Sequence, residues 1–114
     1  MCGAAALALF SCLAVEPTTG RPALATERFD RGMALYYGFD FADAKRAFTQ
    51  AAALDPDAPL PYWGMALADG PNLNQHTPSP AQERSASDAL AQARERAPVT
   101  TSRERGLVDA LSPA

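Results

Sequence analysis

The chain has 114 residues and a formal net charge of -3, and 47% of its residues are hydrophobic. This length allows one modest domain. Alanine provides 25 of the residues, which favours packed helices over strands, so we expect an all-α fold. Lysine and arginine form no cluster that could neutralise phosphates, and we therefore expect no nucleic-acid partner.

Residues 1–15 form an apolar segment of the length found in export signals, too short to span a bilayer comfortably. We expect no transmembrane span and favour an exported, periplasmic or membrane-anchored location over a cytoplasmic one, although no Lys or Arg precedes the run. The alternative is an apolar tail, or a helix packed on the domain. The stretch "LFSC" resembles a lipoprotein box in which Cys12 would receive lipid, with Phe10 in place of the usual small residue.

Both cysteines lie in this segment, so we expect no disulfide or thiolate metal site in the domain. Residues 16–25, "EPTTGRPALA", contain two prolines and a glycine and are expected to form a linker before a domain at residues 26–112.

Two helices are expected next. Apolar side chains recur at helical spacing from Phe29, and Gly38 is expected to end this first helix in a left-handed conformation. Asp40 is expected to cap a second helix, with Asp43 in its first turn, and Asp55-Pro56 to end it. Because the connecting turn is short, the two helices should be antiparallel neighbours.

The second helix has a small-large-small pattern on one face, followed by a proline. Small residues let a partner helix approach closely, while the large residue fills the gap between the helices. The same spacing recurs later, so the chain contains an internal repeat. The two matching sets are Ala44, Phe48, Ala51 and Pro56, and Ala86, Leu90, Ala93 and Pro98.

This pattern resembles the tetratricopeptide repeat (TPR), a helix-turn-helix unit of about 34 residues. With Pro56 as the closing proline, Gly32 and the first matching set occupy the signature positions of the family. Arg28 stands where a tryptophan is usual, and we expect Phe29 to replace it. The stretch "YWGMALADGPNLN" is also similar to a group of bacterial TPR proteins.

The resemblance implies antiparallel helix-turn-helix repeats in an α-solenoid of about two and a half repeats. The first repeat covers residues 26–57. The second covers 58–99, with Ala66 at its small position and a helix expected to begin near Pro61. Its two helices are separated by eight more residues than those of the first repeat, which lengthens the loop at 70–80. Capping boxes are expected at Ser79 with Gln82 and at Thr101 with Glu104.

A half repeat at 100–112 follows, with Leu107, Val108 and Leu111 on its apolar face. A final helix without a partner is either a capping helix or a sign that the chain is a piece of a longer array. We favour the second interpretation.

No constellation of catalytic residues stands out. His76 is the only histidine and lies in a polar loop, and no phosphate loop, nucleophile elbow or Cys/His pair occurs in the domain. We expect no enzyme activity, no metal site and no cofactor.

The function implied by the TPR resemblance is a scaffold that binds a peptide or partner helix of another protein in a concave groove. Apolar and aromatic side chains would recognise hydrophobic anchors there. The alternative is that these side chains pack within the array. The expected groove residues are Phe29, Met33, Tyr36, Tyr37, Trp63 and Leu67.

A second functional hypothesis uses the lengthened loop. An accessory or ligand-binding protein of an enzyme system could use residues 70–80, around Asn72, Asn74 and His76, as its site.

Overall fold

The structure is a computed structural model of the full chain, and it describes residues 2–72, 75–97 and 101–112, with side chains from residue 20 onward. Within these ranges the chain forms helices and no strand, so the expected all-α class is confirmed. The helices are α1 (Cys2–Tyr37), α2 (Phe41–Leu54), α3 (Pro59–Asp69), α4 (Pro80–Arg96) and α5 (Ser102–Leu111).

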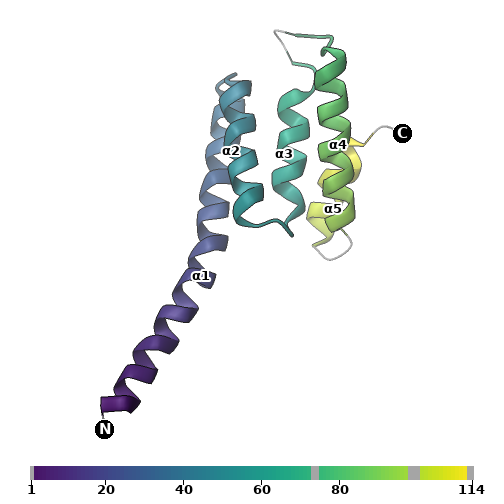
Figure 1. The fold of residues 1–114 in the computed structure, drawn as a ribbon. Helices are drawn as coiled ribbons and strands as arrows, with labels where there is room; N and C mark the ends of the chain where they lie inside the picture. The colour runs from purple at the N-terminus through teal and green to yellow at the C-terminus, as the bar shows by residue number, and fades with distance from the viewer. Residues whose placement is uncertain (1, 73–74, 98–100, 113–114) are drawn as a thin grey trace.

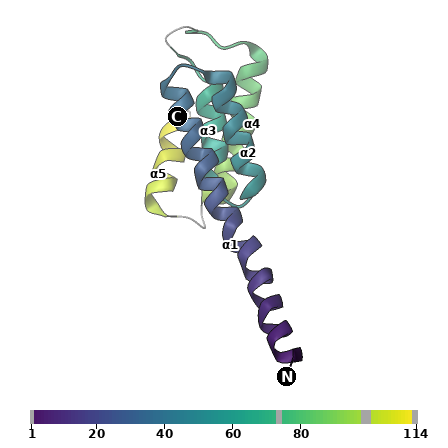
Figure 2. The ribbon, with the colours of Figure 1, turned by 90° about the vertical axis from the view of Figure 1, so that its left-hand side faces the viewer.

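Consecutive helices run in opposite directions and pack side by side (Figure 1). α1 packs on α2 and α3, and α3 also packs on α2, α4 and α5. Figure 2 shows α5 on one side of the molecule and α2 with α4 on the other. The central helix α3 therefore contacts every other helix, and the first, third and fifth helices share a side of the bundle.

The turn between α1 and α2 differs from the expectation. Gly38 does not adopt a left-handed conformation; Phe39 does, with φ of 63°. Its backbone N–H donates to Tyr36 O at 3.0 Å, and that of Asp40 donates to Leu35 O at 2.9 Å. This pair of bonds defines a Schellman motif, in which the left-handed residue must be the one that follows the C-cap. Gly38 is one residue too early to take that place.

Residues 16–25 were expected to form a linker, but they are helical, because α1 continues through them. Ala23, Leu24 and Ala25 are strong helix formers, and extending an existing helix fixes one residue for each new hydrogen bond. Thr26 Oγ1 donates to Pro22 O at 3.1 Å. The proline removes one backbone bond and does not end the helix. Packing begins close to the expected domain boundary, since Ala25 is buried.

The other helix ends follow the local signals. Asp40 caps α2 by accepting a bond from the Asp43 N–H, and α2 ends before Asp55. The capping boxes at Ser79 and Thr101 both form, so these expectations are confirmed. α3 begins at Pro59, two residues before the expected start at Pro61, because both prolines fit in a first turn whose N–H groups have no helical partner.

The core has two clusters, and Phe48 is the largest fully buried side chain. Phe29 packs against it, with ring centroids 5.4 Å apart and ring planes tilted by 50°, whereas Arg28 is exposed. Most of the expected packing positions are buried, Ala86 is partly buried and Pro56 is exposed in its turn; Pro98 lies outside the described residues. The buried ones are Gly32, Ala44, Phe48, Ala51, Ala66, Leu90 and Ala93.

A polar contact crosses this core. Lys45 Nζ of α2 lies 2.6 Å from Asp69 Oδ2 of α3 and donates a 2.8 Å hydrogen bond to Ser85 Oγ of α4. The Asp69 side chain is 8% exposed, so three consecutive helices are joined by one lysine at a largely buried carboxylate.

In the part of the chain that the structure describes, no helix combines the length and the apolar character needed to cross a membrane. Cys12, the candidate lipidation residue, lies in α1, and its side chain falls outside the described residues.

Candidate interaction groove

A groove of about 650 Å3 lies between α1, α3 and α5. These helices alternate in the chain with α2 and α4, so residues far apart in sequence line one surface. The turn from α2 to α3 contributes two further residues. The groove is lined by Ala25, Thr26, Phe29, Asp30, Met33, Tyr37, Asp55, Ala58, Leu60, Pro61, Trp63, Thr101, Arg103, Glu104 and Leu107.

The apolar walls of the groove come from all three helices. Phe29 and Met33 of α1, Trp63 of α3 and Leu107 of α5 are each half-buried, and each lines the groove. Tyr37 is 72% exposed. Half-buried aromatic and aliphatic side chains can hold the apolar anchors of a partner, with the tryptophan and tyrosine adding hydrogen-bonding groups.

The charges of the groove are mainly negative. Asp30, Asp55 and Glu104 line it together with one cation, Arg103. Glu104 also belongs to the capping box of α5, where its Oε2 accepts a bond from the Thr101 N–H at 3.2 Å. The sequence interpretation had explained Asp55 as a turn former only, and it had not considered Asp30 or Glu104 as part of a binding surface.

Four of the six expected groove residues line this groove, namely Phe29, Met33, Tyr37 and Trp63. Tyr36 lies at a different hollow, and Leu67 lines neither. Three of the six, Phe29, Met33 and Tyr36, also pack against the cluster around Phe48, and Trp63 packs against the other cluster. Phe29, Met33 and Trp63 thus line the groove and also pack against the core.

A second hollow, of about 450 Å3, lies where the lengthened loop meets the turn from α1 to α2. Tyr36 makes edge contacts with Tyr37 and with Phe41, at centroid distances of 5.9 and 5.5 Å. The left-handed residue Phe39 is 56% exposed beside them. The residues that line the hollow are Tyr36, Tyr37, Phe39, Phe41, Pro71, Asn72 and His76.

Of the three loop residues expected to form a ligand site, Asn72 and His76 lie at this second hollow. Asn74 lies outside the described residues. Among the described residues, no group of three or more His, Cys, Asp or Glu side chains could hold a metal ion.

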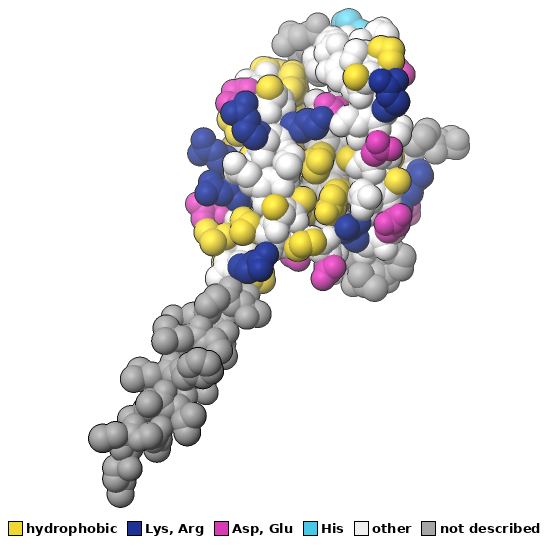
Figure 3. Space-filling model, viewed as in Figure 1, with side chains coloured by type: hydrophobic (Ala, Val, Ile, Leu, Met, Phe, Trp, Pro, Cys, Tyr) yellow, Lys and Arg dark blue, Asp and Glu magenta, His cyan; other side chains and the backbone are white. Residues whose placement is uncertain are grey.

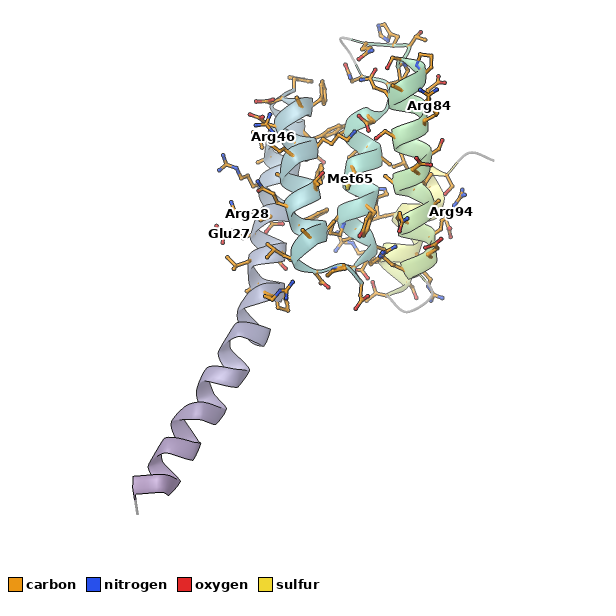
Figure 4. The ribbon with its side chains drawn as sticks, viewed as in Figure 1. Glu27, Arg28, Arg46, Met65, Arg84 and Arg94 are labelled. Atoms are coloured by element: carbon orange, nitrogen blue, oxygen red, sulfur yellow. The ribbon has the colours of Figure 1, made fainter. Side chains whose placement is uncertain are left out.

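The face shown in Figure 3 has a different character. Hydrophobic side chains gather in the seam between α2 and α4, and charged side chains surround them. Figure 4 places Met65 within this seam, Arg28 and Arg46 at one edge of the molecule, and Arg84 and Arg94 at the other. Tyr62 lies near Met65, and Arg96 covers its ring, with Cζ 4.2 Å from the ring centroid. The apolar surface here is narrow, and side chains of both charges border it.

Three features of the molecule were not predicted from the sequence. The Lys45–Asp69 pair joins residues that are distant in the chain, and so does the Arg96–Tyr62 contact. The third feature is that Leu107 of α5 lines the groove, which depends on how α5 docks on α3. Only a three-dimensional arrangement of the helices brings these residues together.

Comparison of the chain with models of protein families, with curated proteins and with solved structures finds no match.

Proposed function

We propose that the protein is a TPR-like interaction scaffold that binds a peptide segment or a partner helix of another protein in the groove between α1, α3 and α5. The observation that carries the proposal is that the first helix of each helix pair, together with α5, contributes apolar side chains to one groove. This is the surface that TPR proteins use, and the proposal interprets α1 to α5 as two and a half repeats. The role is binding without catalysis or a cofactor.

The size of the groove supports this role. A volume of about 650 Å3 is within the range of pockets that bury a compact ligand, and here it extends over three helices. A helix or an extended segment could place two or three apolar side chains between Phe29, Trp63 and Leu107. Binding of this kind is dominated by a few apolar anchors.

The experiment is a pull-down from the native cell extract, with the full chain as bait and with serine variants as controls. Trp63→Ser is a poor choice, because Trp63 also packs against the core. Tyr37→Ser with Leu107→Ser removes apolar surface from α1 and α5, and Tyr37 is mostly exposed. We expect the partner held by the unchanged chain to be lost by this double variant, while circular dichroism shows equal helicity.

Phe39→Ser is the matched control, since Phe39 is an exposed aromatic residue that does not line the groove. It should retain the partner. Equal retention by all three proteins, or loss by the Phe39 variant alone, would contradict the groove as the binding surface.

The second hollow favours one alternative function, a ligand-binding or accessory protein that uses the lengthened loop. Its specific support is that Pro71, Asn72 and His76 of the loop join an aromatic cluster at the end of α1. Removing the eight extra residues of the loop should abolish ligand binding and leave the helicity unchanged. If the shortened chain binds as before, the loop has no such role.

A further inference from the structure

We infer that the groove between α1, α3 and α5 recognises a positively charged segment, in which lysine or arginine accompanies the apolar anchors. This inference rests on the function proposed above and adds the chemical class of the partner. It is carried by the charges along the groove, where three carboxylates are set against one guanidinium.

The three carboxylates are not equivalent. Glu104 bonds to the start of its own helix, whose partly positive end offsets its charge. Asp30 and Asp55 are different, because neither forms an ion pair within 4.0 Å among the described residues. Their negative charges are the ones available to a cationic partner.

The position of Asp55 strengthens the argument. It caps the C-terminal end of α2, where the helix dipole is already negative and a carboxylate is unfavourable. The hydrogen bonds of the turn use only its backbone, since its N–H donates to Ala51 O and its carbonyl accepts from the Ala58 N–H. The carboxylate of Asp55 is in no ion pair within 4.0 Å among the described residues, so it is available to a cationic segment in the groove.

The apolar surroundings reinforce this preference. Asp55 is half-buried, and a carboxylate beside low-dielectric walls attracts a cation more strongly than one in open water. Asp30 is exposed, so solvent screens its attraction more. Trp63 lines the same groove, and tryptophan is the side chain with the strongest attraction for a cation over its ring. On the same helix, Tyr62 already holds the guanidinium of Arg96 at 4.2 Å. A lysine or arginine next to an apolar anchor would satisfy both kinds of contact.

The test measures fluorescence anisotropy with three labelled peptides that share the same leucine and phenylalanine positions. Their remaining polar positions are all lysine, all glutamine or all glutamate, and each peptide is titrated with the full chain at low and high salt. We expect the lysine peptide to bind roughly tenfold more tightly than the glutamine peptide, and the glutamate peptide to bind most weakly. High salt should reduce these differences.

The variant Asp30→Asn, Asp55→Asn should lower the preference for lysine to about twofold or less. The control, Asp88→Asn with Asp109→Asn, changes the net charge equally at two exposed residues outside the groove and should keep the preference. Equal binding of the three peptides would overturn the charge inference and leave the groove as a binding surface. A folded chain that binds none of them would overturn both proposals, and a preference lost only in the control would place the recognition elsewhere.

Discussion

The ring of Phe48 lies directly against the backbone of Gly64, so that a Cβ atom on Gly64 would be only 2.5 Å from Cδ1 of the ring. Gly32 is equally close to this ring, since a Cβ atom on Gly32 would be 2.6 Å from Cε1. Phe48 belongs to α2, and the two glycines belong to α1 and α3. One fully buried ring therefore sets how closely three helices approach each other, and the missing side chains of the glycines make room for it.

Gly64→Ala is expected to destabilise the protein by about 1–3 kcal/mol, because the added methyl group must displace a ring that has no free space. The measurement is the free energy of unfolding from urea denaturation followed by circular dichroism. Gly106→Ala is the matched control, since Gly106 also lies inside a helix but has nothing within 4 Å of the added Cβ. That variant should be unchanged or more stable by up to about 1 kcal/mol. Equal effects of the two substitutions would contradict the close contact.

Phe39→Gly is expected to be more stable than Phe39→Ala by about 1 kcal/mol, because only glycine adopts a left-handed conformation without a steric cost. Both variants remove the exposed ring and its edge contact with Phe41, so their difference isolates the backbone. Thermal denaturation of the two variants provides the comparison. An alanine variant as stable as the glycine variant would show that the turn holds no such strain.

The same turn illustrates how far sequence reasoning reaches. The starts of α2, α4 and α5 were predictable, because an N-terminal cap uses a side chain within three residues of the helix start. At Gly38 the local rule assigned glycine to the left-handed position, whereas the hydrogen bonds to Leu35 and Tyr36 place that position at Phe39. The rule identifies a helix end within a residue or two and does not determine its register.

The groove was predictable in part for a similar reason. Helical spacing put apolar side chains of α1 from Phe29 onward on a helix, and the TPR resemblance assigned them to a groove. Phe29, Met33 and Tyr37 line the groove, and Tyr36 does not. Asp30 lies next to Phe29 in the chain, but its place at the groove depends on the angle at which α1 packs against α3 and on the docking of α5. Those angles arise from contacts such as those of Phe48 with Gly32 and Gly64, and the sequence pattern identifies the small and large residues without giving the angle at which their helices cross.

Lys45→Met is expected to destabilise the protein by about 3 kcal/mol, since it leaves the largely buried carboxylate of Asp69 without a cation. The ammonium group, 2.6 Å away, is the only partner found for Asp69 Oδ2 among the described residues. Combining Lys45→Met with Asp69→Leu should restore much of the loss, because the unpaired charge is then absent. Chemical denaturation of the four proteins forms a double-mutant cycle. Additive effects of the two substitutions would contradict a direct coupling.

Thr101→Ala is expected to loosen α5 without unfolding the rest of the protein. The threonine hydroxyl accepts a bond from the Glu104 N–H at 3.3 Å, and loss of such a cap costs about 1 kcal/mol. α5 has only 10 residues and contacts α3 and α4, so this cost is large relative to what holds the helix in place. Hydrogen exchange measured residue by residue should be faster across 102–111 and unchanged in α2. Ser102→Ala, one residue further on, does not remove the cap and should leave the exchange rates as they are.

Because α5 forms one wall of the groove, the Thr101 variant should also bind the lysine peptide less tightly. Normal binding by a variant whose α5 is loosened would show that α1 and α3 suffice for recognition.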